Sequence, residues 1–390
     1  ADQTIYVGGG TTVAITVGDA EDSASSLNVQ SSITGTGLAS AAVDGSGANR
    51  TVTLVPGSSA GTANVTVSVT DSKGTTTTKT FKVTTVAAVV TSTADSGAGT
   101  LRDVATNVDA GAVITFDPSL NGKTITLSSS VTLPTSVKLQ GPGPNLVTIA
   151  IGFNGGWTWP SAATVQGLTF QGTSSSTYVY VPMNATATVS GCAFVESQLT
   201  AGESTALTVT NSSFTSSSTA IALLESSVDR LTNVTISGTG TGIEILASGV
   251  DVAIASSTIT SATSIILYEG SGTVTLRNSV VSGEIVNGFG THVVQSLDYN
   301  LLASTPDPGA YTLAAHDQSA VDPKLDPLAN YGGTTSTYRL QSTSPAVDAV
   351  PNASCVDASG NALTTDQRGK ARPSGAACDI GAFERQPDDG

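Results

Sequence analysis

Apolar and small polar residues alternate along most of this chain, and one alternating phrase recurs through its middle. The copies read "VQGLTF", "VSGCAF", "VTNSSF", "LTNVTI", "IASSTI" and "LRNSVV", and they end at Phe170, Phe194, Phe214, Ile236, Ile259 and Val281. Subtraction of these residue numbers gives spacings of 24, 20, 22, 23 and 22 residues. A period near 22 with matched apolar positions is typical of a solenoid, in which each repeat forms one coil.

The alternation within each phrase predicts short strands rather than helices. Each coil would then contribute about three strands, stacked about 4.8 Å from those of the next coil, as in a right-handed parallel β-helix. The six final residues of the phrases should form one interior stack. Their first residues should form a second stack, made of Val165, Val189, Val209, Leu231, Ile254 and Leu276.

Three further features of this segment fit a solenoid. Asn211, Asn233 and Asn278 recur within the phrase, where a stacked amide or a left-handed turn would suit asparagine. Cys192 takes the place of a small apolar filler. Near residue 100, "LRDVATNV" has apolar residues at helical spacing, which predicts a short amphipathic lid over the open end of the solenoid.

The first 86 residues follow a different pattern. Period-two alternation appears in "TTVAITV", "RTVTLVP", "ANVTVSVT" and "KTFKVTTV", and turn sequences separate these runs. This pattern predicts an antiparallel β-sandwich. The segment resembles the Ig-like or cadherin-like modules of large bacterial surface proteins, which act as spacers. The fold expected overall is all-β: an Ig-like sandwich over 1–86, a β-helix with a helical lid over 87–300, and a cap over 301–390.

Modules of this kind also include calcium binders, which hold the ion through acidic loops. The resemblance makes Asp19, Glu21, Asp22 and Asp71 the candidate calcium ligands. Their spacing fits no EF-hand-like loop, so solvated turn acids are the favoured interpretation. No other cofactor is predicted.

Composition excludes several classes of partner. The 390 residues include 15 Lys plus Arg against 30 Asp plus Glu, for a net charge of −15. Nucleic acid binding needs clustered basic residues, and an anionic membrane surface would repel this chain. No apolar run approaches the length of a membrane span, so no membrane insertion is expected. The opening "ADQTIYVGGG" suggests the start of a secreted chain.

The cysteines also fit secretion. Cys355 and Cys378 lie close in sequence near the C-terminus, which predicts one disulfide in an oxidising compartment. Cys192 is then left as a buried thiol.

Six segments carry a family resemblance: "TSTADSGAGTLRDV", "ITFDPSLNGKTITL", "LQGPGPNLVTI", "VDPKLDPLANYGGTT", "LQSTSPAVDA" and "DQRGKARPSGAACDIGAFE". Together they resemble bacterial choice-of-anchor Q domain proteins from about residue 90 to Glu384. The resemblance implies a right-handed β-helix at the bacterial cell surface and brings no catalytic residues with it. Only "RQPDDG" follows Glu384, so no sorting signal is seen.

An enzyme on this fold would need particular groups. A lyase needs calcium-bound carboxylates with a basic proton acceptor, and a hydrolase needs two or three converging carboxylates. Between residues 140 and 300 no paired aspartates occur. A solvated carboxylate row on one face and isolated surface histidines are the favoured interpretation, and no catalytic residue is predicted. The residues concerned are Glu225, Glu244, Glu269, Glu284, His292 and His316.

Aromatic residues make up only 5% of the chain. Trp157 and Trp159 form the one concentrated platform, with Tyr178 and Tyr180 nearby. Either a stacked sugar or a loop tucked against the solenoid would account for them.

The favoured function is a secreted, non-enzymatic surface or matrix protein that assembles head to tail with copies of itself. A sandwich joined by the short linker "TVAAVV" to a solenoid has unlike ends, and contacts between unlike ends generate open fibres. The strand Thr4, Ile5, Tyr6 and Val7, followed by three glycines, is the candidate for donation to the next subunit. The alternatives are a monomeric adhesin or stalk that binds surface glycans and, behind it, a polysaccharide lyase or hydrolase.

Overall fold

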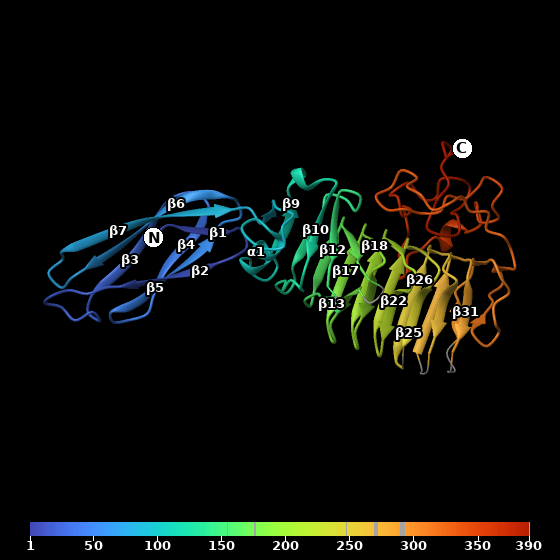
Figure 1. The fold of residues 1–390 in the computed structure, drawn as a ribbon, viewed down its shortest axis with the longest axis horizontal. Helices are drawn as coiled ribbons and strands as arrows, with labels where there is room; N and C mark the ends of the chain where they lie inside the picture. The colour runs from blue at the N-terminus through green and yellow to red at the C-terminus, as the bar shows by residue number, and fades with distance from the viewer. Residues whose placement is uncertain (154, 175–176, 247, 269–271, 289–292, 390) are drawn as a thin grey trace. The chain divides into compact units, whose positions relative to one another are not determined.

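The computed structural model describes all residues except 154, 175–176, 247, 269–271, 289–292 and 390, and its regular secondary structure is almost entirely β-strand (Figure 1). Backbone contacts divide the chain into two compact units. The first comprises Ala1–Ser92, Ser96–Thr115 and Leu133–Val137, and the second comprises Thr93–Asp95, Phe116–Thr132 and Lys138–Gly390. Among the described residues, no helix has the length and apolar character needed to cross a membrane.

The first unit contains the predicted β-sandwich. One sheet has the order β1 (Gln3–Tyr6), β7 (Thr76–Val86), β6 (Gly61–Thr70), β3 (Asn28–Gly35), and the other has the order β2 (Thr11–Thr16), β5 (Asn49–Pro56), β4 (Leu38–Asp44). Strand β1 runs parallel to β7, and the remaining pairs are antiparallel. The inward positions of the alternating runs form the core, which consists of Ile5, Val52, Leu54, Val65, Val67 and Val83.

The segment expected to be a linker is instead buried in the first unit. Strand β7 extends to Val86, β8 (Val89–Val90) follows at once, and Ala88 and Val90 are both buried. The carbonyl of Ala88 accepts the N–H of Thr115 at 3.0 Å, at strand β9 (Val113–Phe116). The linker prediction was wrong because the small apolar residues of "TVAAVV" are stabilised by burial in the first unit, whereas a free linker would expose them to water.

The predicted helix is present as α1 (Leu101–Thr106). Its N-cap Thr100 accepts the N–H of Asp103, which satisfies one of the free donors at the helix start. Leu101, Val104 and Ala105 lie on its buried face. By its contacts, the helix belongs to the first unit.

The second unit is the parallel β-helix, in which three sheets are built from successive coils. The first sheet contains β10 (Lys123–Leu127), β12 (Val147–Ile151), β15 (Thr169–Gly172), β18 (Ala193–Val195), β21 (Ser213–Thr215), β24 (Thr235–Ser237), β27 (Thr258–Ile259), β30 (Val280–Val281), β33 (Leu301–Leu302) and β35 (Gln318–Ser319). The second contains, within this unit, β11 (Lys138–Gln140), β14 (Ala163–Gln166), β17 (Thr186–Ser190), β20 (Ala206–Thr210), β23 (Val228–Thr232), β26 (Val250–Ala255), β29 (Gly272–Arg277), β32 (Val294–Ser296) and β34 (Tyr311–Thr312). The third contains β13 (Gly155–Thr158), β16 (Thr177–Val181), β19 (Gln198–Ala201), β22 (Thr219–Leu224), β25 (Thr241–Leu246), β28 (Thr263–Leu267) and β31 (Glu284–Asn287).

Both predicted interior stacks are confirmed. Phe170, Phe194 and Phe214 are direct strand partners, and the row continues through Ile236 and Ile259 to Val281. The rings of Phe194 and Phe214 stack at 4.6 Å. The row from Val165 to Leu276 is paired in the same way. Every member of both rows is at most 1% exposed, so the 22-residue period is the period of the core.

The recurring asparagines form the corner between the second and first sheets. Asn211, Asn233 and Asn278 have φ of 51°, 55° and 51°, the left-handed conformation that asparagine tolerates. The amide of Asn233 donates to Oδ1 of Asn211 at 3.1 Å. Asparagine therefore serves as the corner residue and also as a rung of a side-chain ladder.

The C-terminal region lies along this corner, over the flank of the coils (Figure 1, orange to red). Asn278 and Asn233 donate their amides to the carbonyls of Ser354 and Thr365 at 2.7 and 2.9 Å. The hydroxyl of Thr335 donates to the carbonyl of Asn211 at 3.1 Å. Most of the region has irregular backbone, including the 3₁₀ turn Asn352–Ser354, and a second such turn lies at Pro118–Leu120.

A disulfide and a buried ionic cluster hold the C-terminal region together. The disulfide joins Cys355 to Cys378, as predicted. Nε of Arg368 donates to Asp366 at 2.8 Å, and its guanidinium lies 3.6 Å from the centre of the Phe383 ring. The fully buried side chain of Arg372 lies 3.1 Å from the carboxylate of Glu384.

The free thiol of Cys192 gives a first prediction. Cys192 is fully buried, and burial raises the pKa of its thiol to about 12. Iodoacetamide should therefore label no cysteine in the native protein, one after denaturation without reductant, and three after reduction. Intact-mass spectrometry counts the labels. Two or three labels before reduction would contradict the pairing.

Asp229 gives a second prediction, because its carboxylate lies inside the solenoid. It occupies a core row between Leu207 and Val252, is 0% exposed, and accepts the N–H of Leu207 at 3.2 Å. Burial raises its pKa to about 6. The folded protein then holds this proton more tightly than the unfolded chain, so the unfolding free energy should fall as pH rises from about 4 to about 6.

Asp229→Asn should remove this pH dependence and make the protein up to about 3 kcal/mol more stable at pH 7. Urea unfolding at pH 4 and pH 7 measures both effects. Glu225→Gln, at an exposed turn of the same coils, is the matched control and should follow the wild-type profile. Parallel profiles for wild type and Asp229→Asn would show that the buried carboxyl does not couple folding to pH.

Candidate functional site

Two strand edges of the sandwich face each other without an intervening strand in the described structure. Strand β2 pairs on one side only, with β5. Strand β7 pairs with β6 along its whole length, but on its other edge β1 covers only Val83–Val86. Thr76–Phe81 of β7 therefore have one strand neighbour instead of two. Open edges of this kind are the places at which a sheet accepts a further strand.

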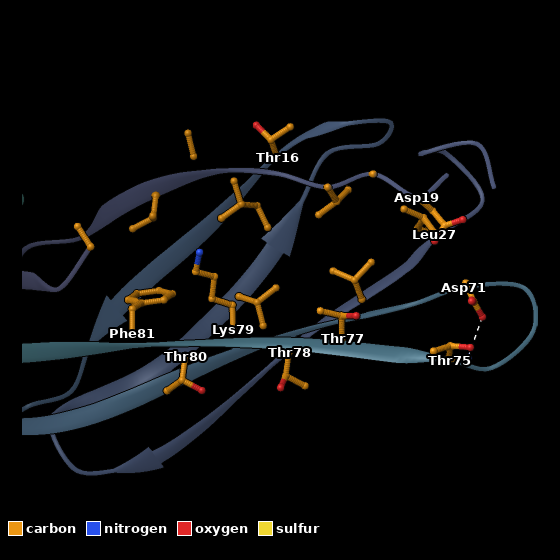
Figure 2. A pocket seen from close by; sticks show the side chains of 18 residues that line it. Thr16, Asp19, Leu27, Asp71, Thr75, Thr77, Thr78, Lys79, Thr80 and Phe81 are labelled. Carbon is orange, nitrogen blue, oxygen red and sulfur yellow. Dashed lines mark hydrogen bonds between the residues drawn. The ribbon is translucent and has the colours of Figure 1, made fainter. Parts of the chain in front are cut away.

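A slot of about 420 Å³ lies between these edges (Figure 2). Val17, Leu27 and Val67 are buried in its wall, at no more than 7% exposed. Val13, Ile15 and Phe81, which also line it, are half-buried. Val13, Ile15 and Phe81 thus pack against the sandwich core but are incompletely covered. We call this space the sandwich slot.

Strand alternation decides which side chains of β7 face the sandwich slot. Figure 2 shows Thr77, Lys79 and Phe81 directed into it, and Thr78 and Thr80 directed to the other face of the sheet. Period-two geometry requires this arrangement. Thr77 and Thr78 are therefore two exposed threonines that lie on opposite faces of one strand.

Polar groups close one end of the slot, where Figure 2 shows Asp19, Asp71 and Thr75. Oδ1 of Asp19 accepts the N–H groups of Glu21 and Asp22, both at 2.9 Å, and these bonds lower its pKa. Oδ1 of Asp71 accepts the N–H groups of Lys73 and Thr75 at 2.9 and 2.8 Å. These carboxylates thus shape their own turns.

The other two calcium candidates join the two turns. Asp22 accepts both the N–H and the hydroxyl of Ser72, at 2.7 and 3.0 Å. Glu21 forms an ion pair with Lys73. The structure therefore brings the four candidates into one region, as acceptors for N–H, O–H and ammonium donors. Among the described residues, no group of three or more His, Cys, Asp or Glu side chains is arranged to hold a metal ion.

The candidate donor strand is already paired within its own sandwich. Gln3–Tyr6 pair with Val83–Val86, and Ile5 is buried in the core. The Tyr6 hydroxyl donates to Asp103 at 2.8 Å. Gly9 lies so close to Asn107 that an added Cβ would fall 2.1 Å from its carbonyl oxygen. The glycine turn thus fixes where β1 ends and limits it to the last four residues of β7.

The expected carboxylate row on the solenoid is not formed by its described members. Glu225 lies in a turn, Glu244 is aligned with Ala222 and Ile266, and Glu284 is aligned with Thr263. The prediction was wrong because the strand register aligns Glu244 with Ala222, 22 residues earlier, whereas Glu225 lies only 19 residues earlier. Glu269 and His292 lie outside the described residues. His316 stacks on Tyr299 and shares a 2.6 Å hydrogen bond with Asp298.

The two tryptophans are core residues, so of the two alternatives left open for Trp157 and Trp159 the stacked sugar does not hold. They are 0% and 1% exposed, and both rings pack against Phe170. Nε1 of Trp157 donates to the carbonyl of Val131 at 2.8 Å. Tyr178 and Tyr180 lie on the outer face of β16 and remain half-buried.

Comparison with known proteins agrees with this architecture. A family model described as "Right handed beta helix region" matches residues 150–303. No curated protein and no solved structure gives a significant match to the chain. The second unit is thus a right-handed parallel β-helix, a fold that hosts enzymes and non-enzymes alike.

Asp71 gives a third prediction, which separates a calcium ligand from a turn-forming carboxylate. Because its Oδ1 already accepts two N–H groups, millimolar calcium should leave the melting temperature of the wild-type protein unchanged. Asp71→Ala should lower stability by about 1 kcal/mol, since both N–H groups lose their acceptor. Differential scanning calorimetry with calcium and with EDTA measures both. A calcium-dependent rise that Asp71→Ala abolishes would establish a metal site.

Proposed function

We propose that this chain is a secreted, non-enzymatic structural protein of a bacterial surface or matrix, whose subunits join head to tail by strand donation into the sandwich slot. The observation that carries the proposal is the open edge of β7 beside a half-covered apolar wall. The resemblance to choice-of-anchor Q domain proteins and the acidic, cysteine-paired composition support the location. The scattered positions of Glu225, Glu244 and Glu284 favour a structural role over catalysis.

A donated strand would satisfy two needs of the slot at once. Its backbone would pair with the free edge of Thr76–Phe81, and its inward side chains would cover Val13, Ile15 and Phe81. Burial of such side chains stabilises association by roughly 25 cal/mol for each Å² of apolar surface removed from water.

The donor that fits is the segment 1–7 of a second copy. Within its own chain this segment pairs as a strand only with Val83–Val86 of β7, because the turn at Gly8–Gly10 holds its end. Beyond that pairing, Asp2 accepts the N–H of Lys82 at 3.0 Å, and Ala1 lies at the wall of the slot. A segment arriving from another molecule is not held by that turn, so it can pair further along the same edge. Exchange between copies thus offers more backbone pairing than the intramolecular arrangement does, and it leaves an empty place on the donor for the next molecule.

A matched pair of variants tests this. Thr77→Lys places a further charged side chain, beside that of Lys79, in the sandwich slot, whereas Thr78→Lys places the same side chain on the opposite face of the same strand. Light scattering and negative-stain microscopy should show filaments for wild type and Thr78→Lys, and monomers for Thr77→Lys, with similar melting temperatures for all three. Deletion of 1–7 should also stop assembly, and a synthetic peptide of that sequence should bind the shortened protein.

If concentrated wild-type protein remains monomeric and the peptide fails to bind, assembly by strand donation is excluded. Equal assembly by Thr77→Lys and Thr78→Lys would place the contact elsewhere.

A further inference from the structure

A second hollow, of about 330 Å³, lies on the outer face of the seven-stranded sheet of the solenoid. It spans four successive strands, from β16 to β25. Tyr180, Thr200, Ala222 and Glu244 follow one another in register along its floor, and Tyr178 and Gln198 form the neighbouring row. Ala222 leaves the floor low where its neighbours carry longer side chains.

The two tyrosine rings lie against the sheet, and two glycines make room for them. A Cβ added at Gly156 would fall 2.0, 2.5 and 2.6 Å from three consecutive ring atoms of Tyr178, so the ring covers that glycine. A Cβ added at Gly202 would fall 2.7 Å from the hydroxyl oxygen of Tyr180, which extends over the following coil. A ring held down in this way offers its other face to solvent. Flat aromatic faces bound by hydroxyl and amide groups suit the apolar face of a sugar ring.

Charge narrows the class of ligand. Of the eight described residues around the hollow, Glu244 is the one that carries a charge, and the whole chain carries −15. An anionic polysaccharide would meet repulsion without a basic partner. A hydrolase would need a second carboxylate across the scissile bond, and the described lining contains one. The site is therefore suited to binding and not to cleavage.

We infer that this hollow, the tyrosine groove, binds an uncharged polysaccharide that runs across the strands along the solenoid. One sugar unit of an extended chain is about as long as the spacing of about 4.8 Å between neighbouring strands, so successive sugars meet successive coils. Tyr178 and Tyr180 supply the stacking faces, while Gln198, Thr200 and Glu244 supply hydrogen-bonding groups. The inference concerns the second unit and does not depend on assembly through the sandwich slot.

Affinity electrophoresis in gels containing mixed-linkage β-glucan, galactomannan or polygalacturonate tests the inference. We expect at least one of the two neutral polymers to retard the protein and polygalacturonate to leave its mobility unchanged. Tyr178→Ala and Tyr180→Ala should each weaken binding about tenfold through loss of a stacking face. Tyr178→Phe, which retains the face, should keep most of the affinity. Tyr299→Ala, a half-buried tyrosine stacked on His316 outside the groove, is the control and should bind like wild type.

Thermal melting of each variant shows whether a loss of binding comes from a loss of folding. The same electrophoresis with Thr77→Lys, the variant expected to stay monomeric, shows whether binding depends on assembly. No retardation by either neutral polymer would overturn the inference. Tighter binding of polygalacturonate, or equal binding by Tyr178→Ala and Tyr299→Ala, would overturn it as well.

Discussion

The second unit depends on one constraint: each coil must place its interior side chains directly above those of the coil before it. Parallel strands of successive coils share backbone hydrogen bonds, so the register between coils is fixed along each sheet. An interior row can then accept Phe, Ile or Val in each coil, but a charged side chain there costs free energy. Asp229 lies in such a row, and the raised pKa of its buried carboxyl reflects that cost. The corner asparagines follow from the same constraint, because every coil must turn at the same place.

The features that repeat could be predicted from sequence, because repetition supplies its own evidence. The 22-residue period predicted the two aligned interior rows and the asparagine corner. The short separation of Cys355 and Cys378 in sequence predicted their disulfide. Features that depend on a single distant contact were not visible. For example, the amide of Asn233 donates to the carbonyl of Thr365, 132 residues away, and no local sequence pattern predicts this bond. The sandwich slot was missed for a related reason. Alternation shows that β2 and β7 are strands, but not that, in the described structure, one edge of β2 and the Thr76–Phe81 part of one edge of β7 have no strand neighbour. The role of Trp157 and Trp159 stayed open at the level of sequence because aromatic clustering looks the same in a core and on a surface.

The charged residues of one C-terminal segment have a structural explanation. Asp366, Arg368, Arg372 and Glu384, all from "DQRGKARPSGAACDIGAFE", are at most 8% exposed and contact one another and nearby backbone carbonyls. Burial of paired charges is costly unless their hydrogen bonds are made, so one misplaced partner would leave the others without compensation. A motif of this kind specifies how an irregular segment folds.

The C-terminal region has a consequence for the time course of folding. A solenoid in which each coil contacts only its neighbours can begin to fold anywhere and grow one coil at a time. Here the corners at Asn211, Asn233 and Asn278 acquire their final partners from Thr335, Thr365 and Ser354, which are synthesised much later. A chain that emerges from its N-terminus can stack these coils early, yet it cannot complete their hydrogen bonds until nearly its whole length has appeared. The coils spanned by the late segment should then open together rather than singly, so that the last part of the chain to arrive converts a stack of separate repeats into one cooperative unit.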